Sequence, residues 1–240
     1  MPYGSIDFLL LLMDRSIIMV FQFAEMKAFL FDFDGTLARL NIDFQAIRKE
    51  ILSLARSHGL WEPVLPDPPY LLECTRAFQE QLACSHPAAA ETFYTMARQL
   101  IEKREWEAAL PENLFPSTAP LLRKLQEKKR RVAILTRNSG SSVYRVFPDL
   151  DDYVDLFLPR EKVKRPKPDP GHLRQAMEGL RILPEQTVMV GDHPIDMVSG
   201  KKAGVFTIGV LSGRTGEAEM KAVDPDWIIP GIGALLELII

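Results

Sequence analysis

The sequence predicts an α/β protein: a three-layer, Rossmann-like parallel sheet with an all-helical insert after the first strand. From about residue 116 onward, short apolar runs alternate with amphipathic segments, as in parallel sheets with right-handed crossovers. Between the first strand and that region, residues 42–113 show only helical periodicity. We therefore expect three parts: an extension at 1–26, a core formed by 27–41 and 114–240, and a helical domain at 42–113.

The first strand is predicted at Lys27–Phe33, a continuous apolar run that suits a strand buried on both faces. A helix should follow, with Asp43 as its N-cap and Gly59 as its stop. After the Pro-rich link WEPVLPDPP, two further stripes at helical spacing predict two more helices. The apolar residues of the three stripes are Phe44, Ile47, Ile51 and Leu54; Leu71, Cys74, Phe78 and Leu82; and Phe93, Met96, Leu100 and Ile101.

The core resumes with a helix that Ser117 can cap. A second helix is expected after Asn138, a third after Pro168, and a fourth at Ile195–Ala203. Between and after them lie apolar runs that predict strands. These runs are RVAILT at 131–136, DLFLP at 155–159, TVMVGD at 187–192, VFTIGV at 205–210 and DWIIP at 226–230.

Composition excludes several classes of protein. The chain has 240 residues, 47% hydrophobic and 25% charged, which is a globular mixture. A formal net charge of −3 argues against nucleic acid as a partner. Cys74 and Cys84 lie ten positions apart without a Cys/His cluster, so we expect reduced thiols in a cytoplasmic protein.

The first 26 residues are apolar, but Asp14 and Arg15 divide them into two halves. Each half is shorter than the roughly 20 residues that span a bilayer, and Met1–Ile6 carries no basic residue of the kind that opens a signal peptide. We consider three interpretations: a tail added by an upstream start codon ahead of Met19 or Met26, an apolar arm packed on the core, or a membrane anchor. We favour the tail added by an upstream start codon, and we expect no membrane partner for the protein.

Carboxylates follow two of the predicted strands. Asp32 and Asp34 end the first strand, where residues two apart point the same way. Asp192 ends the strand at 187–192, and Asp196 lies four residues later. Strands of a parallel sheet present their carboxyl ends at one edge, so these groups should converge. Clustered carboxylates suit Mg²⁺, which prefers oxygen ligands.

Two other strand ends complete a site for phosphate. Thr136 ends its strand just before a helix, whose free N–H groups attract anions. Lys167 lies in the loop KRPKPDP, stiffened by three prolines, where a fixed cation can neutralise phosphate. Arg137 and Asn138 follow Thr136 and are further candidates for binding substrate, although Asn138 would equally serve as a helix cap. Together these groups predict phosphoryl transfer.

These motifs, in this order, resemble those of the haloacid dehalogenase-like hydrolases. The resemblance covers about 210 residues from Lys27 onward and rests on Asp32-Phe-Asp34-Gly-Thr36, Thr136, Lys167 and Gly191-Asp192-x-x-x-Asp196. The helical insert directly after the first motif is similar to the family's smaller cap, and the chain most resembles the phosphoglycolate phosphatase-like group. After Gly-Thr-Leu it departs from the common Val-Asp-Ser pattern, reading Ala38-Arg39-Leu40.

The resemblance implies a covalent route. Asp32 would attack phosphorus, and Asp34 would protonate the leaving oxygen and then activate water. Thr136 and Lys167 would hold the phosphoryl oxygens. Mg²⁺ would bind Asp32, the backbone carbonyl of Asp34, and Asp192, with Asp196 supporting the site from behind. The carboxylate of Asp34 favours phosphoryl chemistry over dehalogenation, because a halide needs no proton.

We therefore expect Mg²⁺-dependent hydrolysis of a small phosphate monoester by a monomer or homodimer. The alternatives are a phosphosugar mutase, a pyrophosphatase or nucleotidase on the same scaffold, and a regulatory protein that keeps the fold without turnover. His193, beside Asp192, is interpreted as loop packing. Trp61, in the Pro-rich link, is interpreted as an exposed or half-packed aromatic.

Overall fold

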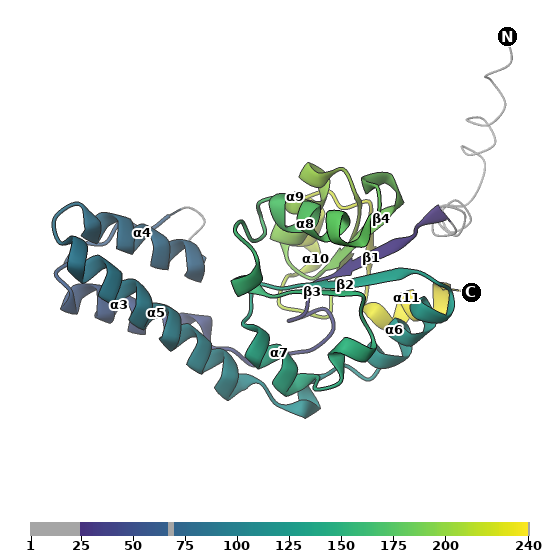
Figure 1. Cartoon of the computed structure of the whole chain (residues 1–240), viewed down its shortest axis with the longest axis horizontal. Coiled ribbons are helices and arrows are strands. Elements are labelled where there is room, and N and C mark those ends of the chain that lie inside the picture. Colours follow the sequence, from purple (N-terminus) through teal and green to yellow (C-terminus); the bar gives the residue numbers. More distant parts are fainter. Residues whose placement is uncertain (1–24, 67–69, 240) are drawn as a thin grey trace, which may run out of the picture. The chain divides into compact units, whose positions relative to one another are not determined.

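The structure is a computed structural model that describes residues 25–66 and 70–239 (Figure 1). The expectations for residues 1–24 and the end of the Pro-rich link lie outside the described residues. The chain divides into two compact units: Leu40–Leu110, and a second made of the chain up to Arg39 together with Pro111 onward.

The larger unit is built on a six-stranded sheet in the order β3-β2-β1-β4-β5-β6. Every neighbouring pair is parallel, which confirms the predicted fold class. The first strand is central, with β2 on one side and β4 on the other. The strands are β1 (Ala28–Phe31), β2 (Arg131–Leu135), β3 (Leu156–Leu158), β4 (Thr187–Gly191), β5 (Phe206–Val210) and β6 (Trp227–Ile229).

Helices cover both faces of this sheet, with α8 and α9 on one side and α6 and α11 on the other (Figure 1). Among the helices in the described part of this unit, α10 and α11 were not predicted from the sequence. The helices of this unit are α6 (Thr118–Glu127), α7 (Gly140–Val146), α8 (Gly171–Leu180), α9 (Pro194–Ala203), α10 (Glu217–Ala222) and α11 (Ile232–Leu238), joined by the short 3₁₀ turns η1 (Pro111–Asn113), η2 (Leu150–Asp152), η3 (Arg160–Lys162) and η4 (Pro184–Gln186).

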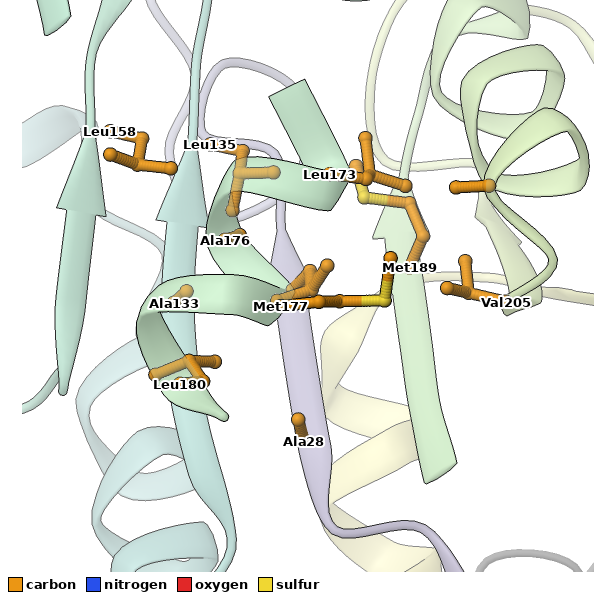
Figure 2. Packing of buried hydrophobic residues seen from close by; sticks show 12 residues of the cluster. Ala28, Ala133, Leu135, Leu158, Leu173, Ala176, Met177, Leu180, Met189 and Val205 are labelled. Atoms are coloured by element: carbon orange, nitrogen blue, oxygen red, sulfur yellow. The ribbon is translucent and has the colours of Figure 1, made fainter. Parts of the chain in front are cut away.

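Alternate side chains of β1 enter different layers of the core, as the two-residue period of a strand requires. Ala28 and Leu30 belong to the cluster beneath α8, into which Leu173, Ala176 and Met177 project (Figure 2). Phe29 and Phe31 stack on each other with ring centroids 6.3 Å apart. Because β1 is buried on both faces, its apolar run is continuous rather than alternating.

The described residues of the smaller unit form three helices, α3 (Phe44–Ser57), α4 (Leu71–Ala83) and α5 (Pro87–Ala108). Asp43 caps α3 as predicted, since its Oδ1 accepts a hydrogen bond of 2.9 Å from the Ala46 amide. The interior is apolar, with Phe78 of α4 and Phe93 of α5 in ring contact. Trp61 in the link is 73% exposed.

Three local predictions were wrong in detail. The first strand ends at Phe31 rather than Phe33, because the chain turns there and the Phe33 carbonyl accepts three amide hydrogens from 36–38. Ser117 precedes α6 but its side chain makes no capping bond. Asn138 does not cap α7; Ser139 does, accepting from the Ser142 amide. No helix in the described ranges is long and apolar enough to cross a membrane.

Candidate active site

The sheet order brings the candidate residues to one edge. Asp32 directly follows β1, Thr136 follows β2 and Asp192 follows β4, and β1 lies between the other two strands. Lys167 lies in the connection from β3 to α8. The candidates thus come from the carboxyl ends of four strands, where parallel α/β sheets bind their ligands.

Lys167 is the cation of the site. Its side chain is 0% exposed, and Nζ lies 2.6 Å from Oδ1 of Asp32 and 2.6 Å from Oδ1 of Asp196. Burial lowers the pKa of Lys167, but the charges and hydrogen bonds of Asp196 and Asp32 outweigh it and leave the pKa raised. Lys167 is therefore a charged ammonium that joins the end of β1 to the first turn of α9.

Asp32, Asp192 and Asp196 each offer a carboxylate oxygen, and these oxygens all lie within 4.8 Å of one another. Burial, reinforced by the charge of Asp196, raises the pKa of Asp32 to about 6 despite the opposing effect of Lys167. Burial, then the charges of Asp32, Asp196 and Asp34, raises the pKa of Asp192 to about 8. Ionising all of these carboxylates costs free energy because they are buried and repel one another, and a bound cation offsets that cost.

Two glycines press against the carboxylate of Asp192. A Cβ added to Gly35 or to Gly213 would overlap its oxygen atoms. Gly35 also has φ +91°, in the left-handed region where glycine is favoured. The two loops are tied together, since the Ser212 hydroxyl donates to the Gly35 carbonyl at 2.7 Å. Asp192 therefore lies in a narrow backbone cradle formed after β1 and β5.

Asp196 and His193 belong to the start of α9. The Asp196 Oδ2 accepts the His193 amide at 3.2 Å, and His193 Nδ1 accepts the Ile195 amide at 3.3 Å. These bonds form a capping box. The bond from the Ile195 amide gives the His193 ring a structural role at the start of the helix. Asp196 uses Oδ2 for the helix and Oδ1 for Lys167.

Asp34 lies in the tight turn after β1, where it forms a backbone bridge with Ala38. Its charge is close enough to raise the pKa of Asp192. The amides of Thr36 and Leu37 close this turn by bonding to the Phe33 carbonyl, and Asp34 within it is half-buried.

Thr136 is fully buried, and its hydroxyl bonds within its own turn. Its hydroxyl donates to Oδ1 of Asn138 at 3.0 Å and accepts the Asn138 amide at 3.1 Å. Arg137 is half-buried between them. Burial is the main cause that lowers the pKa of His172 and of His193, and the charge of Arg137 adds to it in both. Arg137 thus contributes positive potential to the same edge of the sheet as Lys167.

The cradle glycine Gly213 and the buried His172 were missed from the sequence. Gly213 lies after β5, a strand whose end carries no acid, so nothing in the local pattern marked it. His172 lies five residues after Lys167 in PKPDPGH. The only signal for it was a histidine at the start of a helix predicted to pack on the sheet.

A family model described as haloacid dehalogenase-like hydrolase matches residues 26–204. The chain belongs to this haloacid dehalogenase-like family. That match confirms the resemblance drawn from the four motifs, and it spans the strands that carry Asp32, Thr136, Lys167 and Asp192.

Among haloacid dehalogenase-like relatives, the protein named pyrophosphatase PpaX of Halalkalibacterium halodurans is 26% identical over 226 residues. The alignment covers 90% of this chain and 97% of that protein. A pyrophosphatase PpaX of Bacillus cereus is 27% identical over 88% of this chain and 94% of its own length.

Solved structures show the same fold. A haloacid dehalogenase-like hydrolase of Bacteroides fragilis is 26% identical with a TM-score of 0.61, covering 88% of this chain and 99% of that one. The protein CbbY of Rhodobacter sphaeroides, solved with phosphate, is 20% identical with a TM-score of 0.60, over 88% and 96% of the two chains. At that identity the second likeness shows the fold alone.

Proposed function

We propose that this protein hydrolyses a small phosphate monoester, with Mg²⁺, through a phosphorylated Asp32. The observation that carries the proposal is the pairing of Asp32, at the tip of the central strand, with the fully buried ammonium of Lys167. A carboxylate held by a fixed cation beside an acidic cluster is prepared to attack phosphorus rather than to bind a neutral ligand.

The chemistry assigned to the carboxylates follows the family. A carboxylate oxygen of Asp32 forms a bond to phosphorus, and the bond from phosphorus to the leaving alcohol oxygen breaks. Asp34 gives that oxygen its proton. Asp34, now ionised, takes a proton from water, whose oxygen attacks phosphorus and displaces Asp32. The products are an alcohol and inorganic phosphate, and both carboxyl groups return to their starting states.

The described residues fit Mg²⁺ by the chemistry of their donors, since Asp32 and Asp192 offer hard carboxylate oxygens in a group within 4.8 Å. By the family's pattern, the backbone carbonyl of Asp34 would be a further ligand. The raised pKa of Asp192 is a second reason, because a buried carboxylate among carboxylates gains most from a cation. When bound, Mg²⁺ supplies charge neutralisation to the phosphoryl group and to Asp32.

Binding of the phosphoryl oxygens is assigned to Lys167 and Thr136, with Arg137 and Asn138 beside them. Lys167 supplies a charge that does not titrate in the working range. Asp196 supports Lys167 from behind. The expected partner is a small phosphorylated molecule; a cytoplasmic location and a monomeric or homodimeric state stay predictions.

A second candidate is pyrophosphate, because relatives that align over about nine-tenths of the chain are named pyrophosphatases. Pyrophosphate uses the same attack, with phosphate as the leaving group. A panel of sugar, carboxylic-acid and nucleotide monophosphates plus pyrophosphate, assayed for released phosphate with Mg²⁺ and with excess chelator, separates the two. Preference for one ester supports the first candidate, and preference for pyrophosphate supports the second. Isomerised hexose phosphate without phosphate release would indicate a mutase instead.

A further inference from the structure

His172 is a buried histidine that the assigned chemistry does not use. It lies in the first turn of α8, its side chain is 0% exposed, and both ring nitrogens have partners in the backbone. Nε2 lies 3.0 Å from the Leu158 carbonyl oxygen, and Nδ1 lies 3.4 Å from the Lys167 amide nitrogen. The ring therefore bridges the end of β3 and the backbone of the catalytic lysine.

The partners fix the tautomer. A carbonyl oxygen can only accept and an amide N–H can only donate, so Nε2 carries the hydrogen and Nδ1 accepts. Burial, and the positive charge of Lys167, lower the pKa of His172 to about 3, so the ring is neutral across the working range. A protonated ring would place a hydrogen on Nδ1 against the Lys167 N–H, and the bridge would be lost.

The residues next to Lys167 explain why its amide needs His172 Nδ1 as an acceptor. Pro166 and Pro168 flank it, and proline has no amide hydrogen. The Lys167 N–H is therefore the single backbone donor of 166–168, and it is buried. A buried amide without an acceptor costs free energy comparable to a lost hydrogen bond, and here His172 Nδ1 is the acceptor.

The bridge also reaches the strand end that carries Thr136. The Leu158 carbonyl accepts the Thr136 amide at 3.2 Å as well as His172 Nε2. A chain of three hydrogen bonds thus runs from the Thr136 backbone through Leu158 and His172 to the Lys167 backbone. The two groups assigned to hold phosphoryl oxygens share one buried support.

We propose that His172 is a positioning residue: its neutral ring holds the Lys167 backbone in the register that sets Nζ against Asp32. The positioning role itself does not depend on the proposed function; only the expected effect on the rate of hydrolysis rests on it. A misplacement of about 1 Å in a catalytic group can cost on the order of a hundredfold in rate, so even a partial loss of register should be measurable.

Two conservative variants each keep half of the bridge. His172→Asn places an amide oxygen near Nδ1 and retains an acceptor for Lys167. His172→Gln places an amide nitrogen near Nε2 and retains only the donor to Leu158. Leu173→Ala, at the next position and equally buried, is the control that loses packing but no hydrogen bond.

With an aryl phosphate as substrate, we expect His172→Gln to lower kcat about tenfold. His172→Asn should stay within about threefold of wild type, and Leu173→Ala should lose thermal stability while keeping kcat within about twofold. Equal loss in Asn and Gln variants, or a Leu173→Ala loss as large as that of His172→Gln, would make His172 a packing residue and overturn the proposal.

A measurement on the wild-type protein needs neither folding of variants nor turnover. The ¹⁵N chemical shifts of the His172 ring report its tautomer, and amide exchange reports the Lys167 N–H. We expect the neutral Nε2–H tautomer and a slowly exchanging Lys167 amide. A charged ring or an Nδ1–H tautomer contradicts the bridge even if the enzyme is active. Conversely, a protein that releases no phosphate but shows both signals removes the proposed function and leaves the bridge in place.

Discussion

Lys167 Nζ lies 2.6 Å from Oδ1 of Asp32, and the lysine has no exposure to solvent. The same ammonium is shared with Asp196, while Asp192 stands beside the pair with a pKa raised to about 8. Three carboxylates are grouped around one buried ammonium, so the group carries an excess of negative charge. This excess of negative charge should make the group depend on a cation, and the position of Asp32 beside Lys167 suits the nucleophilic role proposed for it.

Asp32→Asn should abolish turnover and leave the fold intact. The amide is nearly the same size as the carboxylate but is not a nucleophile toward phosphorus, so we expect a fall of at least about a thousandfold in kcat. Phosphate release and circular dichroism measure the two effects. The matched control is Asp224→Asn, the same change at an exposed position paired with Lys201. A variant at position 32 with near wild-type rate would remove Asp32 from the role of nucleophile.

Turnover should depend strictly on Mg²⁺. Excess chelator should stop phosphate release, and readdition of Mg²⁺ should restore it. The reason is that the raised pKa values of Asp32 and Asp192 disfavour ionisation of both carboxylates unless a cation is bound. Asp192→Ala should raise the Mg²⁺ concentration required for half activity by about tenfold or more. Full activity in excess chelator would show that no exchangeable metal takes part.

The metal-free protein should become less stable as pH rises. The folded state raises the pKa of Asp192 from 3.8 to about 8 and that of Asp32 from 3.8 to about 6, so it holds protons that the unfolded chain has released. The contribution is present below about pH 4 and is lost as pH rises through about 8. Thermal midpoints in chelator between pH 5 and pH 8 measure it.

The same reasoning predicts that Asp192→Asn stabilises the metal-free protein. At pH 8 the gain should be on the order of 1–3 kcal/mol, with a smaller gain at pH 5, while turnover requires more Mg²⁺. Added Mg²⁺ should stabilise wild type at pH 8 and have little effect on the variant. A variant whose unfolding profile parallels that of wild type at every pH would place the source of the pH dependence elsewhere.

Gly213→Ala should weaken the metal site without unfolding the protein. Its Cβ would overlap the Asp192 carboxylate, which must then rotate or shift. We expect at least about a tenfold loss of Mg²⁺ affinity, since the ligand geometry is disturbed. Gly216→Ala is the control three residues away, where an added Cβ meets no atom within 4 Å. Equal Mg²⁺ affinity in the two variants would show that the cradle does not hold Asp192.

The fold was predictable because its signals are local. Each core strand was marked by its apolar run, and strand-to-helix alternation indicated the parallel sheet. The unpredicted helices α10 and α11 have six and seven residues and no side-chain cap. Both helices are too short to show helical periodicity in the sequence. They are stabilised by packing; in α10, for example, Met220 lies against Gly209.

The candidate site was predictable where its residues follow strands in a recognisable motif order. Asp32, Lys167, Asp192 and Asp196 are brought together as the motif order implies. The capping role of Asn138 was wrong because Ser139 competes for the same helix start, and sequence alone does not decide between adjacent polar residues. His172 was missed because its partners, Leu158 and Lys167, come together only through the packing of α8.

The nucleophilic role of Asp32 is tested most directly by trapping the phosphorylated enzyme. The protein is mixed with aryl phosphate and Mg²⁺, quenched within milliseconds, and treated with borohydride, which reduces an acyl phosphate to an alcohol; the peptides are then sequenced by mass spectrometry. We predict homoserine at position 32 in wild type and none in Asp32→Asn. A reduced residue at Asp34, Asp192 or Asp196, or no reduced carboxylate in an enzyme that is turning over, would contradict the mechanism.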